Sequence, residues 1–173
     1  MIVVERTLAV SAGPALVLGY LKDFANTQQW DPTAQRTTRN DAGPLAPGST
    51  WHHACKIFGI TAELTYTLIT ADPGRLVFHG RNEGATCTDT VLVRPTGSGT
   101  EVAYRVELEL HGLAKLTTPF LKIEFEKLGT ESVTRLTTAL NELVTPAAER
   151  TTELHFPGNA LNTAPIRGQE AQA

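Results

Sequence analysis

The sequence predicts an α+β domain in which a seven-stranded, curved antiparallel sheet wraps around one long C-terminal helix. Three features point to this fold class. A strand-like N-terminus is followed by short helical segments, six further alternating runs lie between strong turn signals, and one long amphipathic stretch comes after them. Short connections between consecutive strands favour antiparallel neighbours, so we expect a meander.

The N-terminal part predicts one strand and two short helices. Residues 2–10 alternate between polar and apolar positions, which is the period-2 pattern of a half-buried strand. Pro14 suits the first turn of a helix, and apolar residues recur at helical spacing through Phe24. This helical pattern fails by Pro32, and a second short helix fits near residues 25–29.

Six alternating runs occupy the centre of the sequence. Turn-forming residues separate them, for example at Asp72-Pro73-Gly74 and at 96–99. The expected strands cover residues 33–40, 50–58, 60–70, 75–81, 86–94 and 100–111.

The last expected element is a long amphipathic helix. Thr118 can cap it and Pro119 suits its first position. Apolar residues then recur at steps of three and four from Leu121 to Leu143, which forms one apolar stripe. Gly129 interrupts this helix at a cost of roughly 1 kcal/mol relative to alanine. Close approach of a ligand or a strand explains such a glycine, and a plain surface kink is the alternative.

Length and composition fit one globular domain. The chain has 173 residues, of which 41% are hydrophobic, enough for a sizeable core. We expect residues 1–145 to form the domain and residues 146–173 to form an irregular tail, which contains few large apolar side chains. The net charge of -3 offers no attraction to a polyanion, so no nucleic-acid partner is expected.

Membrane, secretory and metal-binding classes find no support in the sequence. No stretch is long and apolar enough for stable membrane insertion, and the first residues lack the pattern of a signal peptide. A cytoplasmic location is therefore expected. Cys55 and Cys87 lie far apart without a CxxC or HxxxH pattern, so we expect neither a disulfide nor a metal site.

Several short motifs occur in an order that is specific for fold. They are Val10–Pro14, Trp30–Pro32, Pro47–Ser49, Ala71–Leu76 and Pro95–Thr100. With these motifs the sequence resembles the Bet v 1-like or START-like (SRPBCC) superfamily, and within it the bacterial polyketide cyclase/dehydrase group, from Val4 to Leu143. The resemblance implies a helix-grip fold with a cavity between the sheet and the long helix.

The resemblance leaves function open, because such folds include lipid carriers, plant hormone receptors and aromatase/cyclases. Aromatase/cyclases of this group carry a pocket arginine in the strand that matches residues 60–70. This strand contains no arginine or lysine here. An aromatase that uses that arginine is therefore not expected, whereas another cyclisation, dehydration or isomerisation stays open.

Strand alternation assigns side chains to the concave face, where a ligand would lie. Phe125 and other apolar residues of the long helix should face the same space. The expected ligand contacts are Trp51, Cys55, Leu64, Tyr66, Leu68, Phe78, Cys87, Val91, Tyr104, Val106, Leu121, Phe125 and Leu128.

Two ionisable residues, His53 and Asp89, fall on this otherwise apolar face and are the candidate catalytic residues. Burial should raise the pKa of the carboxyl group and lower that of the imidazole, which would suit a general acid and a neutral base. Tyr66 and Tyr104 could orient a substrate through their hydroxyl groups. The alternatives are a hydrogen-bonded core histidine, an aspartate at a strand end, and tyrosines that only pack in the core.

Two leading functions are consistent with this polarity. One is a cofactor-independent cyclase, dehydratase or related lyase/isomerase that acts on a hydrophobic biosynthetic intermediate. The other is a non-enzymatic carrier or binder of a lipid-like or aromatic ligand, and a protein-interaction module is a third reading. The inner-face polar groups favour the enzyme. We expect a monomer or homodimer with a small-molecule partner and no metal or organic cofactor.

Overall fold

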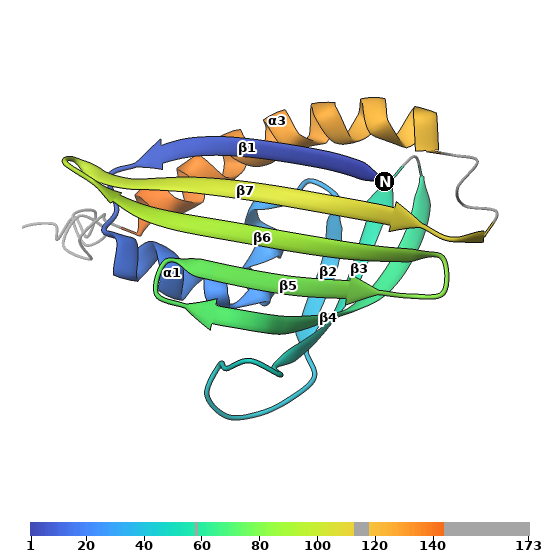
Figure 1. Ribbon diagram of the computed structural model, residues 1–173, viewed down its shortest axis with the longest axis horizontal. Helices are drawn as coiled ribbons and strands as arrows, with labels where there is room; N and C mark the ends of the chain where they lie inside the picture. Colours follow the sequence, from blue (N-terminus) through green and yellow to red (C-terminus); the bar gives the residue numbers. More distant parts are fainter. Residues whose placement is uncertain (58, 113–117, 144–173) are drawn as a thin grey trace, which may run out of the picture.

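The computed structural model describes residues 1–57, 59–112 and 118–143, with residues 118–122 described as backbone only. It confirms the predicted order of strands and helices (Figure 1). The elements are β1 (Ile2–Val10), α1 (Pro14–Lys22), the 3-10 helix η1 (Phe24–Asn26), α2 (Thr27–Trp30), β2 (Ala34–Arg39), β3 (Thr50–Ile57), β4 (Ile60–Asp72), β5 (Arg75–Arg81), β6 (Ala85–Thr96), β7 (Gly99–Leu110) and α3 (Thr118–Glu142). The predicted tail, residues 146–173, lies outside the described residues.

The seven strands form one antiparallel sheet in the order β1-β7-β6-β5-β4-β3-β2. Six strands make a meander, and β1 joins it by pairing with the last strand, with Val4 opposite Val106. Figure 1 shows α3 running along the sheet beside β1. The α+β helix-grip fold predicted from the sequence is therefore confirmed, with the long helix held against the curved sheet.

Strand β4 contains an irregularity that limits how far alternation predicts its faces. The register with β5 shifts between Leu68 and Thr70, and Ile69 between them is 48% exposed. Before this bulge, the positions expected on the concave face are correct, because Leu64 and Tyr66 are buried. A bulge adds one residue to one strand and so reverses the faces of the residues after it.

One end of the concave face is filled by aromatic side chains. Phe24 of η1 stacks on Tyr66 at a centroid distance of 4.1 Å and lies 4.9 Å from Phe78. It also lies 6.1 Å from Trp51. Because these side chains are buried and in mutual contact, this end of the sheet is packed core.

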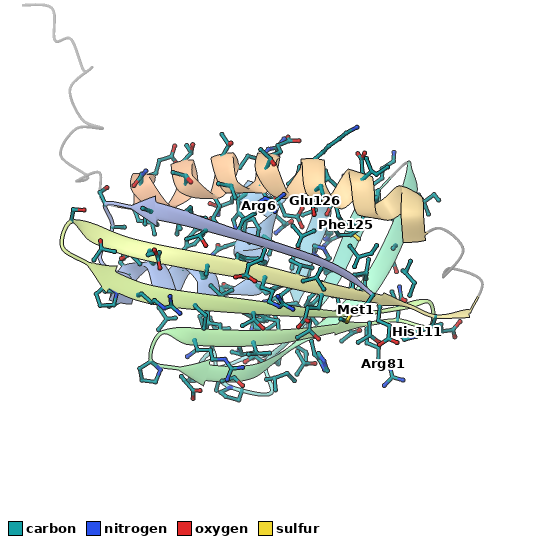
Figure 2. The ribbon with its side chains drawn as sticks, turned by 45° about the horizontal axis from the view of Figure 1, so that its top comes forward. Met1, Arg6, Arg81, His111, Phe125 and Glu126 are labelled. Carbon is teal, nitrogen blue, oxygen red and sulfur yellow. The ribbon has the colours of Figure 1, made fainter. Side chains whose placement is uncertain are left out.

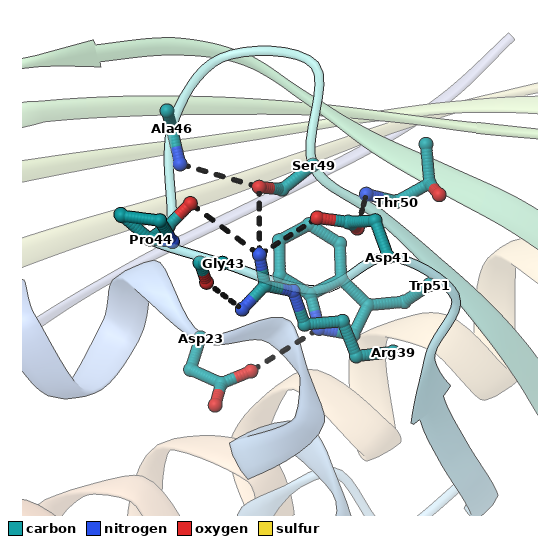
Figure 3. Close-up of polar contacts among 9 residues, drawn as sticks. All are labelled: Asp23, Arg39, Asp41, Gly43, Pro44, Ala46, Ser49, Thr50 and Trp51. Atoms are coloured by element: carbon teal, nitrogen blue, oxygen red, sulfur yellow. Dashed lines mark hydrogen bonds and ion pairs between the residues drawn. The ribbon is translucent and has the colours of Figure 1, made fainter.

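A carboxylate anchors η1 in this place. Asp23 accepts a hydrogen bond from the Ala25 backbone N–H at 3.0 Å and another from Trp51 Nε1 at 3.1 Å. The first bond caps the helix, and the second ties it to β3. At the end of β2, Arg39 donates to Asp41 Oδ2 at 2.7 Å and to the Gly43 carbonyl oxygen at 2.9 Å, as Figure 3 shows. Both contacts hold the chain that leads into β3.

Helix α3 approaches β1 closely at Gly129. A Cβ atom at this position would lie 2.9 Å from Cγ1 of Val4, closer than real Cβ atoms come. The glycine therefore allows the approach of a strand, one of the two reasons expected from the sequence. Arg6 of β1 fastens the contact, since its Nη2 donates to Glu126 Oε2 at 2.6 Å and to the Glu126 carbonyl oxygen at 3.1 Å (Figure 2).

Within the described residues, no helix combines the length and apolar character that crossing a membrane requires. The same residues contain no group of three or more histidine, cysteine, aspartate or glutamate side chains placed to hold a metal ion.

Candidate functional site

A cavity of about 530 Å³ lies between the concave face of the sheet and α3. This volume is in the range of small-molecule sites. Strands β3, β4, β6 and β7 supply most of the sheet residues in its wall, and Phe125, Ser132 and Leu136 of α3 close the opposite side. Ile60 borders the cavity and is also 71% exposed, so the opening lies near the β3–β4 hairpin.

Asp89 of β6 is the buried carboxyl group of this cavity. The residue is 4% exposed. Oδ1 accepts a hydrogen bond from the Cys87 thiol at 3.3 Å, and Oδ2 accepts one from the Tyr104 hydroxyl at 3.3 Å. Burial raises the pKa of Asp89 from 3.8 to about 7, although the hydrogen bond from Cys87 acts to lower it. The carboxyl group can therefore gain or lose a proton near neutral pH.

Tyr66 reaches the same part of the cavity because of a glycine. Its ring lies directly over Gly80 of β5, where any Cβ atom would overlap with the ring carbons. Gly80 pairs with Cys87 in the next strand. The missing side chain thus lets the Tyr66 ring lie across β5, with its hydroxyl end towards β6.

The hydroxyl groups around Asp89 stay protonated. Burial, with a further contribution from the charge of Asp89, raises the pKa of Tyr66 and of Tyr104 well above 10. The pKa of the Cys87 thiol is likewise raised, first by burial and then by the same carboxylate. The cluster of Asp89, Tyr66, Tyr104 and Cys87, called here the Asp89 cluster, therefore holds one group that titrates near neutral pH among three that remain neutral.

His53 of β3 lies on another part of the cavity wall and is 4% exposed. Its Nδ1 lies 2.8 Å from the Thr37 hydroxyl of β2. Its ring packs edge-on against Tyr66 at a centroid distance of 5.4 Å. Burial lowers the pKa of His53 from 6.5, and Asp31 partly opposes this effect. The imidazole is therefore neutral at physiological pH and available as a base.

The end of α2 and the turn after it contribute cavity residues, of which the sequence reasoning did not expect Asp31. Asp31 borders the cavity, and its Oδ1 accepts hydrogen bonds from the Thr33 backbone N–H at 2.8 Å and from the Thr33 hydroxyl at 2.9 Å. Trp30 packs edge-on against Tyr104 at 5.3 Å. The Trp30–Pro32 motif has the pattern of a helix end followed by a turn. It therefore indicated the fold, but it did not indicate that Asp31 borders a binding site.

Arg6 was also missed, although strand alternation places it on the same face as Leu8. It borders the cavity while its guanidinium remains paired with Glu126. Strand β4 contains no arginine, as the sequence already indicated. Among the described residues, Arg6 is the one arginine that borders the cavity.

The expected site residues divide into three groups. Ten of them border the cavity: His53, Cys55, Leu64, Tyr66, Cys87, Asp89, Tyr104, Val106, Phe125 and Leu128. Four do not border it but lie in the packed core at no more than 1% exposure: Trp51, Leu68, Phe78 and Val91. The side chain of Leu121 lies outside the described part of the chain. Phe24 borders the cavity and its ring packs against Trp51 and Phe78 of this core group.

Cys55 and Cys87 are poorly suited to act as nucleophiles in this arrangement. Both are buried and unpaired with each other. Burial raises the pKa of Cys55 to about 11, and its thiol lies 3.6 Å from the Ala62 carbonyl oxygen. Thiols with a raised pKa react slowly, because the thiolate is the reactive form.

Solved structures share this fold. The Zhui aromatase/cyclase from Streptomyces sp. R1128 aligns with a TM-score of 0.69 and 13% identity, over 84% of this chain and 96% of that one. A START superfamily protein from Mycobacterium smegmatis gives 0.62 and 16%, over 82% and 96%. A protein from Thermus thermophilus gives 0.60 and 18%, over 80% and 97%. At such identities the likeness shows the fold alone.

A search of curated proteins finds no match to this chain. The family described as polyketide cyclase / dehydrase and lipid transport matches residues 1–141, which is most of the chain. The chain belongs to this polyketide cyclase / dehydrase and lipid transport family.

Proposed function

We propose that the protein is a cofactor-independent acid–base catalyst of the cyclase or dehydratase type, acting on a hydrophobic biosynthetic intermediate. The observation that carries this proposal is the Asp89 carboxyl group. It is buried in the cavity beside neutral donors, and its pKa of about 7 lies where a proton-transfer catalyst works best. A carrier gains nothing from such a group, whereas an acid–base catalyst requires one.

The surroundings of Asp89 suit the role of general acid. In its protonated form the carboxyl group can donate to a substrate oxygen, either a carbonyl that becomes an enol or a hydroxyl that leaves as water. Tyr66 and Tyr104 keep their protons. The Tyr66 hydroxyl can hold that oxygen by a hydrogen bond, and the Tyr104 hydroxyl can do so when it turns from Asp89 Oδ2. Much of the remaining wall is apolar, and low polarity around these groups strengthens such interactions.

His53 suits the complementary role of base, because it is neutral and borders the same cavity. Strands β4 and β5 separate it from Asp89, which is roughly 14 Å across the sheet at about 4.8 Å per strand. The register also offsets the two residues along the strands, because His53 pairs with Leu64 whereas Asp89 pairs with Phe78, which lies opposite Leu68. Inward side chains on a concave face converge on the space between them. A substrate with two reacting carbon–oxygen groups could thus meet the base at one position and the acid at another.

The reaction can be tested with a synthetic diketone of suitable chemistry, 1-phenylhexane-1,5-dione. Removal of a methyl proton by the base, attack on the phenyl ketone and loss of water convert it to 3-phenylcyclohex-2-enone, which absorbs in the near ultraviolet. We expect the wild-type protein to accelerate this conversion. His53→Gln and Asp89→Asn should each lower the rate by ~10²–10⁴-fold while the diketone still binds.

The matched control is His79→Gln, since His79 lies on the exposed face of β5. That variant should convert the diketone at the wild-type rate. If the diketone binds and neither cavity substitution changes its conversion, acid–base catalysis is refuted.

The runner-up function, a carrier of a lipid-like or aromatic ligand, is favoured by the largely apolar wall supplied by residues such as Val106, Leu108 and Leu136. Binding of the diketone and its cyclic product without any rate acceleration would favour the carrier. Failure of both to bind would contradict both functions.

A further inference from the structure

Two buried threonines connect His53 to the backbone through a chain of hydroxyl groups. Thr27 of α2 and Thr37 of β2 are both 4% exposed. The Thr27 hydroxyl lies 2.8 Å from the Phe24 carbonyl oxygen and 3.0 Å from the Thr37 hydroxyl, which lies 2.8 Å from His53 Nδ1. Neither threonine is part of the acid–base pair proposed above.

The direction of each hydrogen bond in this chain follows from its first member. A carbonyl oxygen only accepts, so the Thr27 hydroxyl must donate its single hydrogen to Phe24. Its oxygen can then only accept from Thr37, whose own hydrogen is thereby used. The Thr37 oxygen must in turn accept from His53, which places a hydrogen on Nδ1.

We infer that Thr27 and Thr37 are positioning residues that hold neutral His53 in the Nδ1–H tautomer and leave the lone pair of Nε2 to the cavity. The tautomer of a histidine is set by the hydrogen bond that its other nitrogen makes. This arrangement fixes which ring nitrogen of His53 accepts a proton.

The position of Nε2 agrees with this assignment. Nε2 has no hydrogen-bond partner among the described residues, and the imidazole borders the cavity. In the described part of the chain, Arg39 Nε is the one fully buried side-chain nitrogen or oxygen atom without a hydrogen-bond partner. Nε2 is therefore not sealed in the core, and the space it meets is the cavity.

The inference deepens the proposed function, and its catalytic consequence rests on that function. Nε2 of His53 would take a proton from the substrate, and the resulting positive charge would be shared with the Nδ1–H that Thr37 holds. The tautomer itself rests only on the hydrogen-bond chain. It can therefore be measured without a substrate, and its failure is distinct from failure of the proposed catalysis.

Substitution of Thr27 gives an unusual expectation, because this residue does not touch His53. In Thr27→Val the Thr37 hydroxyl loses its acceptor and becomes free to donate to His53 Nδ1. The Nε2–H form should then be populated. In Thr37→Val, Nδ1–H loses its buried acceptor, so the preference of His53 for the Nδ1–H form should fall as well. Thr37→Ser keeps the hydroxyl and should keep the wild-type tautomer.

The test is long-range ¹H–¹⁵N correlation of histidine side chains in uniformly labelled protein, at a pH of about 8, where the lowered pKa keeps His53 neutral. Loss of signals in His53→Asn, together with through-bond assignment, identifies this ring. We expect a protonated Nδ1 and a bare Nε2 in the wild type, in Thr37→Ser and in the matched control Thr38→Val, whose side chain lies on the exposed face of β2.

A bare Nδ1 in the wild-type protein would overturn the inference. So would an unchanged Nδ1–H signal in a folded Thr27→Val or Thr37→Val variant. If the tautomers behave as expected but His53→Gln keeps full turnover of the diketone, the positioning stands and the assignment of His53 as the base is wrong.

Discussion

Replacement of Asp89 by asparagine removes the carboxyl group whose pKa burial raises from 3.8 to about 7. The amide has the same shape and can still accept from Cys87 or donate towards Tyr104. Each pKa unit corresponds to about 1.4 kcal/mol of differential interaction. Ionised Asp89 in the folded state thus costs roughly 4 kcal/mol relative to the unfolded chain, a penalty that asparagine avoids.

The sign of the pH dependence depends on which state binds the proton more tightly. The folded protein holds the Asp89 proton more tightly than the unfolded chain, so the stabilisation is fully present below about pH 4. It is lost progressively as the pH rises to about 7, and no further loss occurs above that. Asp89→Asn should therefore gain stability relative to wild type by about 3 kcal/mol between roughly pH 5 and pH 8.

Urea unfolding of both proteins across this pH range measures the difference directly. Other titrating groups, including His53, are common to both proteins and largely cancel. A difference in unfolding free energy that stays constant from pH 5 to pH 8 would refute a neutral, buried Asp89 carboxyl group. It would also remove the main support for the proposed general acid.

Three further predictions concern the cavity and the packed core beside it. Gly80→Ala should destabilise the protein by ~1–3 kcal/mol in urea, because its methyl group would overlap with the Tyr66 ring. Gly97→Ala, with open space around it, should stay within about 0.5 kcal/mol of wild type, and equal effects would contradict the packing argument. Phe24→Ala should cost ~3–5 kcal/mol in the same assay, since the ring fills the space between η1 and the sheet; a loss under about 1 kcal/mol would argue against it. The two cysteines should react with Ellman's reagent in the folded protein far more slowly than in urea, and rapid native reaction would contradict their burial.

Much of the fold could be predicted because local patterns decide it. In β3, strict alternation places Trp51, His53 and Cys55 on one face, and all three are buried there. Turn signals such as Gly74, whose φ of 84° few other residues tolerate, separated the strands correctly. The bulge near Ile69 carried no such local signal, because it arises from pairing with β5.

The limits of the cavity could not be predicted from alternation alone. A strand pattern tells which side chains face inward, but it does not tell which other element fills the space above them. Trp51 and Phe78 face inward as expected, yet Phe24 packs against them and neither borders the cavity. Asp31 and Thr27 enter the site through tertiary contacts of a turn and a four-residue helix, which no periodic pattern describes.

The most direct test of the central claim is whether a hydrophobic small molecule occupies the cavity between the sheet and α3. Isothermal titration calorimetry with 3-phenylcyclohex-2-enone can compare the wild type with Ser132→Phe, whose new ring would fill the cavity from α3. Thr130→Phe, on the exposed face of the same helix, is the matched control. We expect binding to the wild type and to Thr130→Phe but not to Ser132→Phe. Equal binding to all three proteins would contradict the account.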